Sequence, residues 1–439
     1  MTDFDLIIIG SGPGGYTTAA RAAASGLRVM LCERDELGGT CLNRGCIPTK
    51  ALCHTASLAA AAREAAAAGG NIGREISVDL AAAMNRKDSI VAELRQGVAM
   101  ELKDVTVIKG EASFLAADTI EIDGTQYNAP QIVVATGSRP AMLDIPGAEL
   151  AVNSDFMLSC RELPESITII GGGVIGIEFA SILADCGAKV TVIEYCQEIL
   201  PPFDAEVAKR LRMCLKRRGI KIITGAAVKS IEEGMKVTYE SKGRLSAVES
   251  SMVLMAVGRR PVLPAGLEQL GIELHRGFIK ADPLTMESSL KGVYAIGDVN
   301  GLCLLAHAAE AQGAALLGHK INLGVIPSAV FCRPECAMAG LTEEQARSRE
   351  IDIMVGQSTF RSNGKAIAMG EPDGMVKVIA DRSNGKLLGC HICGAHAADL
   401  IAEPALAIAH GLTAADLLAT VHTHPTLGEV IPRALSALA

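Results

Sequence analysis

The feature that most constrains the fold of this chain is a unit of strand, glycine-rich turn, helix, strand and acid that occurs twice. In the first copy an apolar run at 4–9 leads into Gly10-Ser11-Gly12-Pro13-Gly14-Gly15, and Glu33 ends the next apolar run, 23 positions after Gly10. A G-x-G-x-x-G turn lets the main chain approach a pyrophosphate at a helix N-terminus, and the acid can bond a ribose hydroxyl. The unit therefore predicts a dinucleotide site built from Gly10, Gly12, Gly14, Gly15 and Glu33.

The second copy repeats this order in the middle of the chain. An apolar run at 167–170 leads into Gly171-Gly172-Gly173-Val174-Ile175-Gly176, and Glu194 again follows 23 positions after the first glycine. No Arg or Lys lies between 195 and 208, so no nearby cation is available for a 2′-phosphate. We expect this site to bind NAD rather than NADP, through Gly171, Gly173, Gly176 and Glu194.

Both copies close on similar stretches, at 135–140 and 256–261. The first copy spans 127 positions from Gly10 to Gly137, and the second spans 87 from Gly171 to Gly258. The first copy therefore carries an insertion. Two complete dinucleotide sites in one chain indicate a flavoprotein that passes a hydride between two cofactors.

The insertion contains a pair of cysteines, Cys41 and Cys46, among glycines. Pro48 suits the first turn of a helix, and the alanine-rich run 51–68 is expected to form that helix. Cys46 would then lie near a helix N-terminus, where the partial positive charge lowers the pKa of a thiol. Two buried cysteines in a glycine-rich turn would give the same spacing. The position directly after a nucleotide unit favours a reactive pair.

Composition limits the kind of protein. A chain of 439 residues can form two to four domains, and its net charge of −8 argues against non-specific nucleic-acid binding. No uncharged apolar run is long enough to span a membrane, and the first strand starts too early for a secretory signal. We expect a cytoplasmic protein whose 13 cysteines are mostly reduced.

Two further cysteine pairs lie in the C-terminal third, Cys332 with Cys336 and Cys390 with Cys393. The second pair falls in an expected strand at 387–393, where positions i and i+3 point to opposite faces. We interpret both pairs as core cysteines and expect no metal site. Whether these cysteines have any other role is not decided by the sequence.

Two dinucleotide units with a C-x4-C pair between them resemble the pyridine nucleotide–disulfide oxidoreductases, and within that family the dihydrolipoyl dehydrogenases. Tyr294-Ala295-Ile296-Gly297-Asp298 resembles the family's second flavin motif, and Leu305-Ala306-His307 follows it. The stretch His422-Thr423-His424-Pro425-Thr426-Leu427-Gly428-Glu429 resembles the signature H-x-H-P-T-x-x-E. One departure is Phe331-Cys332-Arg333-Pro334-Glu335, because relatives usually have His before the Pro-Glu.

The resemblance implies an α/β fold with two Rossmann-like dinucleotide-binding domains and a C-terminal α+β dimerisation domain. We expect the first part of an FAD-binding domain, with the redox disulfide, at 1–142 and an NAD-binding domain at 143–263. The second part of the FAD-binding domain would follow at 264–327, and the dimerisation domain at 328–439.

The resemblance also implies roles for single residues. Cys46 would face the flavin, and Cys41 would be the thiol that exchanges with the substrate. His424 would be the catalytic base, oriented by Glu429. Lys50 would lie near the flavin ring, paired with Glu178 of the second nucleotide helix. Further cofactor-binding positions carried over from the family are Gly39, Thr40, Lys50, Thr136, Gly137, Gly258, Asp298 and Ala306.

The function so implied is the oxidation of dihydrolipoamide on a lipoyl protein, with tightly bound FAD and with NAD⁺ as acceptor. The partner would belong to a 2-oxo acid dehydrogenase complex or a glycine-cleavage system. The family is homodimeric, and its histidine reaches the other subunit's site; the spacing here does not decide whether His424 does so. Two alternatives stay open: a related NAD(P)H-dependent disulfide or metal-ion reductase, and a non-catalytic flavoprotein that binds lipoyl proteins.

Overall fold

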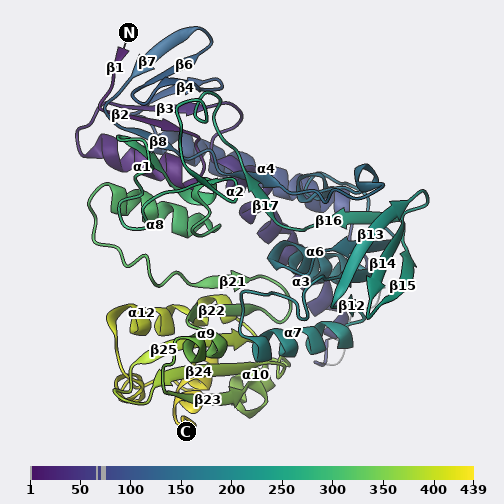
Figure 1. Cartoon of the computed structure of the whole chain (residues 1–439). Helices are drawn as coiled ribbons and strands as arrows, with labels where there is room; N and C mark the ends of the chain where they lie inside the picture. The colour runs from purple at the N-terminus through teal and green to yellow at the C-terminus, as the bar shows by residue number, and fades with distance from the viewer. Residues whose placement is uncertain (1, 66–67, 71–75) are drawn as a thin grey trace. The chain divides into compact units, whose positions relative to one another are not determined.

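The computed structural model describes residues 2–65, 68–70 and 76–439 (Figure 1). The chain forms two compact units, each assembled from separate stretches. The first unit contains Met1–Ala51, Met84–Ala141 and Arg259–Leu323. The second unit contains Leu52–Ala83, Met142–Gly258 and Gly324–Ala439.

A five-stranded parallel sheet with the order β20-β8-β2-β3-β4 is the centre of the first unit. Its inner strands are rich in Ile, Val and Leu and are buried, as expected for a parallel sheet covered on both faces. The bounds are β2 Leu6–Ile9, β3 Val29–Glu33, β4 Thr106–Lys109, β8 Ile132–Val134 and β20 Val293–Ala295.

Helix α1 (Pro13–Ala24) and helix α8 (Ala306–Leu316) lie side by side in this unit (Figure 1). A Cβ atom on Gly313 would come within 1.8 Å of Thr18 Oγ1, so only glycine permits this approach of the two helices. Strand β20 thus joins the sheet that contains β2, and α8 packs beside α1, although both elements come late in the chain. The other elements here are β1 Thr2–Asp3, β5 Ser113–Ala116, β6 Thr119–Ile122, β7 Thr125–Asn128, β9 Ser138–Pro140, β17 Arg259–Pro261, β18 Leu274–His275, β19 Phe278–Ile279 and η2 Gly297–Asn300.

The helix after the first cysteine pair starts earlier than predicted. Helix α3 spans Cys46–Glu64 instead of starting at Ala51, and the short helix α2 (Gly39–Arg44) precedes it. Pro48 lies in the first turn of α3, where the main chain needs no N–H donor, and it therefore does not mark the boundary. The predicted end near Ala68 is also too late, although residues 66–67 lie outside the described residues. Helix α4 spans Leu80–Glu101.

The second unit contains a parallel sheet with the order β12-β11-β10-β16. Helix α6 (Val174–Cys186) follows β10, and helix α7 (Ala205–Arg217) starts at the N-cap Asp204. The strands are β10 Ser166–Ile170, β11 Lys189–Ile193, β12 Lys221–Ile223 and β16 Met252–Met255, with an antiparallel sheet of β13 Ala226–Glu232, β14 Lys236–Ser241 and β15 Arg244–Glu249. Short helices η1 Ala148–Leu150 and α5 Ser154–Met157 precede them.

The C-terminal residues of this unit form a five-stranded antiparallel sheet with the order β21-β22-β25-β24-β23. The helical elements around it enclose a continuous apolar core. The strands are β21 Ser328–Val330, β22 Cys336–Gly340, β23 Ile353–Thr359, β24 Met375–Asp381 and β25 Leu387–Cys393. The helices are α9 Glu343–Ser348, η3 Phe360–Ser362, α10 Gly364–Ala368, α11 Ala397–Leu400, α12 Ala402–His410, α13 Ala414–Leu418, η4 Leu427–Glu429 and α14 Val430–Leu435. Two parallel sheets of nucleotide-binding type and this mixed C-terminal part confirm the predicted fold class.

A buried lysine links this antiparallel sheet to α7. The side chain of Lys377 on β24 is 2% exposed, and its Nζ lies 3.1 Å from Asp204, 2.7 Å from Glu206 and 2.6 Å from Glu343. Burial alone would lower the pKa of Lys377, but the three carboxylates outweigh it and raise the pKa. The pKa of Asp204 is lowered because the attraction of Lys377 outweighs burial.

The expected core cysteines are buried, and the strand at Leu387–Cys393 is confirmed. Cys393 lies opposite Cys336 on the neighbouring strand, and its thiol shares hydrogen bonds with those of Cys336 and Cys214. Burial raises the pKa of the Cys336 and Cys390 thiols, which disfavours reactive thiolates there. Within residues 2–65, 68–70 and 76–439, no three His, Cys, Asp or Glu side chains are grouped to hold a metal ion.

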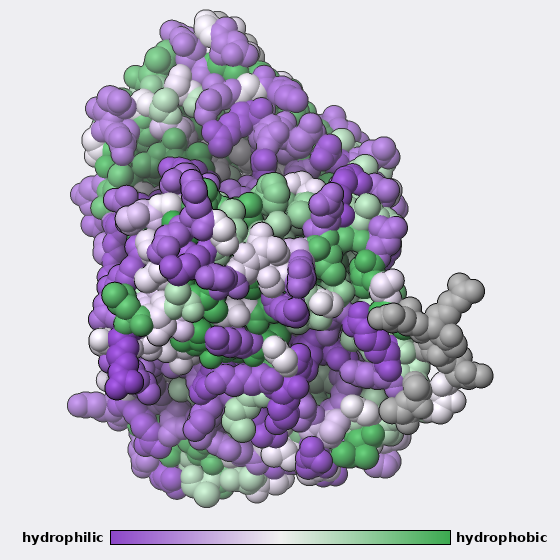
Figure 2. All heavy atoms as spheres, turned by 90° about the vertical axis from the view of Figure 1, so that its right-hand side faces the viewer, coloured by the Kyte–Doolittle hydropathy of each residue, from purple (hydrophilic) through white to green (hydrophobic). Residues whose placement is uncertain are grey.

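Hydrophilic residues cover most of the face seen in Figure 2, and apolar residues occur there only in small groups. Across the described part of the chain, no helix combines the length and the apolar character that a membrane crossing requires.

Candidate active site

The first glycine turn connects β2 to α1 and has the shape of a phosphate cradle. A Cβ on Gly15 would lie 1.9 Å from the Gly10 carbonyl oxygen, so the helix can sit this close to the turn only with glycine. A Cβ on Gly12, in contrast, would meet nothing within 4 Å. Gly12 is the N-cap of α1, and no side chain caps the helix there. The start of α1 therefore has free space beside Gly12 and no capping side chain, which suits an anion.

Glu33 at the end of β3 fixes this turn. Its Oε2 accepts hydrogen bonds from the Ser11 N–H at 2.9 Å and from the Ser11 hydroxyl at 2.6 Å. Its Oε1 accepts from the Asp35 N–H at 2.8 Å. A carboxylate has about four acceptor positions, so Glu33 keeps capacity for a ribose hydroxyl beside the turn.

The second glycine turn, between β10 and α6, repeats this geometry. A Cβ on Gly176 would lie 2.0 Å from the Gly171 carbonyl oxygen, and a Cβ on Gly173, the uncapped N-cap of α6, would meet nothing within 4 Å. Oε2 of Glu194 accepts from the Gly172 N–H at 2.5 Å, and Oε1 accepts from the Cys196 N–H at 2.6 Å. Both turns thus have room for a pyrophosphate, and both acids are placed for a ribose.

The two cysteines of the insertion lie together in the first unit. Cys41 is in α2, Cys46 is the first residue of α3, and their thiols share a hydrogen bond. That hydrogen bond and burial raise the pKa of Cys41, whereas the Lys50 ammonium one turn along α3 acts in the opposite direction. Cys46 is the first residue of α3, which confirms its predicted place near a helix N-terminus.

Asn43 holds the loop that carries the cysteines, a role that sequence reasoning missed. Its amide donates to the carbonyl oxygens of Gly39 and Leu37 at 2.9 Å each, and its own oxygen accepts from the Arg95 guanidinium at 2.7 Å. A Cβ on Gly45 would lie 2.8 Å from the Thr40 carbonyl oxygen, so the turn between α2 and α3 is tight.

Asp298 in η2 lies beside the closing stretches of both glycine units. The Ser138 hydroxyl donates to its carboxylate, and the Arg259 Nε lies 3.7 Å from the same oxygen. Arg259 also donates to the Ser138 hydroxyl at 2.6 Å. Sequence reasoning missed Ser138 and Arg259; the repeated stretches that contain them were the available signal.

The other predicted cofactor positions of the first unit lie at element ends. Thr40 is in α2, Ala306 begins α8, and Gly137 immediately precedes β9. The Thr136 hydroxyl donates to the Val262 carbonyl oxygen at 2.5 Å. In the second unit, Gly258 follows β16 with φ +108°.

Glu178 is a buried carboxylate on α6 of the second unit, 5% exposed. Its Oε1 accepts from the Phe331 main-chain N–H at 2.9 Å. The donor comes from the segment after β21, in which the sequence departs from the family pattern.

His424 and Glu429 of the second unit form a hydrogen-bonded pair. His424 Nδ1 lies 2.9 Å from Glu429 Oε1, and the Thr426 N–H donates to Oε2 at 2.9 Å. The hydrogen bond with His424 lowers the pKa of Glu429, so the carboxylate stays ionised near His424. The side chain of His424 is 79% exposed. Its other ring nitrogen is therefore accessible from outside, and a histidine in such a position can donate or accept a proton.

A second histidine–carboxylate pair fixes the same loop. His422 Nε2 lies 2.9 Å from Glu403 Oε1 on α12, and Nδ1 lies 3.0 Å from the Thr420 carbonyl oxygen. Glu403 lies 19 positions from His422, so nothing local in the sequence predicts this pair.

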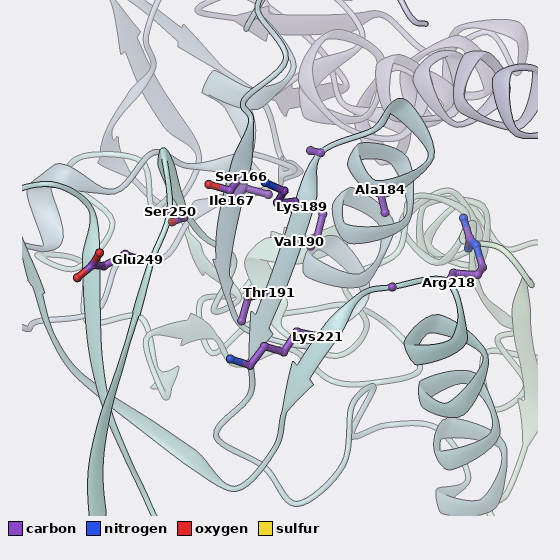
Figure 3. A pocket seen from close by; sticks show the side chains of 12 residues that line it. Ser166, Ile167, Ala184, Lys189, Val190, Thr191, Arg218, Lys221, Glu249 and Ser250 are labelled. Atoms are coloured by element: carbon purple, nitrogen blue, oxygen red, sulfur yellow. The ribbon is translucent and has the colours of Figure 1, made fainter. Parts of the chain in front are cut away.

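A cavity of about 490 Å³ in the second unit lies away from the nucleotide turn (Figure 3). Ser166, Lys189 and Lys221, the first residues of β10, β11 and β12, line it. It is therefore at the amino ends of the strands, whereas dinucleotides bind at the carboxyl ends. Two of its cations are already paired, Lys189 with Glu165 and Arg218 with Asp185.

Within the first unit the structure thus brings together the first glycine turn, Glu33 and the dithiol with Lys50. Within the second it forms the glycine turn with Glu194, and separately the pair of His424 with Glu429.

Comparison with known proteins agrees with this geometry. Residues 4–313 match the family described as pyridine nucleotide-disulphide oxidoreductase, and residues 326–435 match the dimerisation domain of that family. A dihydrolipoyl dehydrogenase of Geobacillus stearothermophilus is 38% identical, covering 97% of this chain and 94% of the relative. One of Thermus scotoductus is 39% identical, covering 100% of this chain and 98% of the relative.

Solved structures match over the same length. The HOCl-induced flavoprotein disulfide reductase RclA of Escherichia coli has a TM-score of 0.86 and 30% identity, covering 98% of this chain and 99% of that one. The family match extends over both nucleotide units and the C-terminal sheet. The chain belongs to the pyridine nucleotide-disulphide oxidoreductases.

Proposed function

We propose that this enzyme oxidises dihydrolipoamide carried on a lipoyl protein and reduces NAD⁺, with FAD between the two. The observation that carries the proposal is the pair of touching thiols, Cys41 and Cys46, held at the start of α3 in the unit with the first dinucleotide turn. A dithiol in this place can be oxidised to a disulfide and reduced again, which is the chemistry of a thiol–disulfide reductase.

His424 acts as the base in the proposed mechanism. It takes the proton from a thiol of dihydrolipoamide, since the thiolate is the form that attacks a disulfide. Glu429 holds the ring through Nδ1, fixes the tautomer and stabilises the imidazolium. We infer that His424 serves the other subunit of a homodimer, in line with its exposed side chain and the match to a dimerisation domain.

Cys41 and Cys46 carry the two electrons. The substrate thiolate attacks Cys41 Sγ, the Cys41–Cys46 bond breaks, and Cys46 leaves as a thiolate. The second substrate thiol then attacks the mixed disulfide and releases lipoamide, which leaves the protein pair reduced and the substrate oxidised by two electrons. A bound FAD supplies what thiols lack, because it can take up two electrons and give up a hydride.

The charged residues proposed for the flavin side are Lys50 and Glu178. Glu33, Asp298 and the first glycine turn would hold FAD, and Glu194 with the second turn would hold NAD⁺. We further place the enzyme in the cytoplasm, a proposal supported by its 13 cysteines, since a chain so rich in thiols suits a reducing compartment. A lipoyl domain of a 2-oxo acid dehydrogenase complex or glycine-cleavage system is the proposed partner.

A second candidate is an NAD(P)H-dependent reductase of another disulfide or of a metal ion. The structural match to RclA favours it, because that protein is titled a disulfide reductase and one of its structures a Cu(II) complex. The two candidates differ in the direction of electron flow and in the acceptor.

The deciding experiment is anaerobic NADH formation by the purified yellow protein with dihydrolipoamide and NAD⁺, with NADP⁺ in parallel. Fast turnover specific for NAD⁺ is expected. Absence of turnover, with the flavin still bleached by NADH, would contradict the proposal and favour the second candidate. Oxidised small thiols and Cu(II) would then be tested as acceptors.

A further inference from the structure

A short segment of the C-terminal domain, Phe331 to Arg333, lies along one face of α6. Glu178, Ser181 and Asp185 are three and four positions apart and therefore share that face of the helix. The Phe331 N–H donates to Glu178 Oε1 at 2.9 Å, and the Arg333 N–H donates to Ser181 Oγ at 3.0 Å. β21, which leads into the segment, also contacts α6.

The carbonyl groups of the same segment are bound as well. The Phe331 carbonyl oxygen accepts from Cys53 Sγ on α3 at 3.2 Å, and the Arg333 carbonyl oxygen accepts from the Arg218 guanidinium. All four main-chain polar groups of Phe331 and Arg333 thus have partners. The backbone of the segment, and with it the N–H that reaches Glu178, is held in one place.

The side chain of Arg333 anchors the segment to two helices. It binds Glu64 at the end of α3 with two parallel hydrogen bonds of 3.0 and 2.7 Å. Its Nε lies 3.8 Å from Asp185 on α6, and Arg218 pairs with the same Asp185. The hydrogen bonds from Arg333 lower the pKa of Glu64 and keep that partner ionised. Two-point pairing of this kind fixes direction as well as distance.

A buried carboxylate is sensitive to each of its donors. Glu178 is 5% exposed, so water cannot replace a main-chain N–H that moves away. A shift of the 331–333 segment would move the Phe331 N–H away from Oε1 and let the carboxylate turn. The conformation of Glu178 therefore depends on the side chain of Arg333 through the main chain of this segment.

We propose that Arg333 is a positioning residue, which holds the Phe331 N–H against Glu178 and so fixes the orientation of that carboxylate. The inference rests on the proposed role of Glu178. It gives a purpose to the sequence departure at Arg333, because a histidine there could not bind Glu64 through two parallel N–H groups.

The test compares Arg333→Gln, Arg333→Lys and Glu178→Gln with a matched control, Arg382→Gln, which removes an arginine paired with the exposed Asp352. Each purified holoenzyme is reduced anaerobically by two electrons with dihydrolipoamide, and the long-wavelength absorbance of a thiolate against oxidised flavin is recorded. The pH dependence of that absorbance, kcat and KM are measured in parallel.

We expect Glu178→Gln to change the absorbance and its pH dependence, and Arg333→Gln to change both in the same direction. Turnover of Arg333→Gln should fall about tenfold with KM little altered, as when one hydrogen bond to a charged group is lost. Arg333→Lys should recover part of the change, and Arg382→Gln should match the unaltered protein.

The inference would be overturned if Arg333→Gln left the absorbance and turnover unaltered while Glu178→Gln changed them. If the Arg333→Gln protein does not retain flavin, the Glu64→Gln protein is measured in its place, because this substitution removes only the exposed partner of Arg333. A smaller change of the absorbance and turnover in the same direction supports the inference. Unaltered absorbance and turnover of Glu64→Gln refute it. Unaltered spectra in Glu178→Gln would refute the role of Glu178 itself. The proposed function is tested separately, by NADH formation in the unaltered protein.

Discussion

His424 Nδ1 lies 2.9 Å from Glu429 Oε1, and the other oxygen of Glu429 accepts the Thr426 N–H. The carboxylate is therefore fixed on one side by the main chain and presents its other side to the ring. This arrangement orients the exposed ring nitrogen of His424.

Replacing Glu429 by Gln should lower dihydrolipoamide oxidation by about tenfold or more, within the range of general-base effects. The pKa of Glu429 is lowered, so its charge is present above the ordinary carboxyl range and is lost only as pH falls through that lowered pKa. Without the charge the imidazolium loses support, and the acid limb of kcat/KM should move to lower pH. The measurement is a pH profile of the variant beside Glu344→Gln, an exposed acid on α9; equal profiles for both would contradict this role.

Cys46→Ser should keep bound flavin and lose dithiol oxidation by about a thousandfold or more, because serine cannot complete the disulfide. Cys41→Ser should do the same. Bleaching of the flavin by NADH should persist in both. Cys160→Ser, which alters a loop cysteine of the second unit, is the control. Full turnover of the Cys46 variant with dihydrolipoamide would disprove the mechanism.

Glu194→Ala and Glu33→Ala remove the same contacts from equivalent turns and should have different consequences. We expect Glu194→Ala to raise KM for NAD⁺ about tenfold with flavin content unaltered, since a hydrogen bond to a charged group is lost. Glu33→Ala should instead weaken flavin retention. Flavin content and NAD⁺ kinetics of both proteins check this. A better rate with NADPH than with NADH in the unaltered protein would refute the assignment of Glu194.

Lys377→Met should destabilise the second unit by about 3–5 kcal/mol, because Asp204 then keeps a buried charge without its partner. The midpoint of urea unfolding measures this. The exposed lysine variant Lys280→Met, which breaks the surface pair with Glu273, should leave the unfolding midpoint nearly unaltered. Adding Asp204→Asn to Lys377→Met should restore part of the loss, and no recovery would argue against the charge as its cause.

The same cluster predicts how stability depends on pH. The pKa of Asp204 is lowered from 3.8, so its contribution is complete above that value and disappears as pH falls through the lowered pKa. The pKa of Lys377 is raised from 10.5, so its contribution is complete below that value and disappears as pH rises through the raised pKa. Lys377→Met removes the cation that lowers the pKa of Asp204, so the difference in unfolding free energy between the two proteins should narrow as pH falls through the carboxyl range. A difference that stays constant over that range would contradict this.

Local patterns in the sequence predicted the parts of the site that one stretch of chain can build. The glycine turns, Glu33 and Glu194 belong to single strand–turn–helix units, and their geometry follows from those units. The start of α3 was predicted five residues too late, at Ala51 instead of Cys46, because the alanine-rich run was taken as the whole helix; Pro48 does lie in the first turn, as predicted. The domain boundaries at 142, 263 and 327 stay predictions.

The partners that could not be predicted lie far apart along the chain. Ser138 and Asp298 are 160 positions apart, and Phe331 and Glu178 are 153 apart. Such pairs arise from tertiary packing, which no periodicity or spacing encodes. Arg333 is the clearest case, because its departure from the family pattern was visible and its partners Glu64 and Asp185 were not.

Strand β20 joins the sheet of β2, and α8 packs beside α1, although both are encoded late in the chain. This order has a consequence for biosynthesis. The parallel sheet of the second unit is complete once residues 166–255 have left the ribosome. The sheet that begins at Leu6 still lacks β20 at that moment, and α1 lacks its neighbour until residue 316 is made. We therefore expect the first glycine turn, although encoded first, to gain its final neighbours after the parallel sheet beside the second turn is complete.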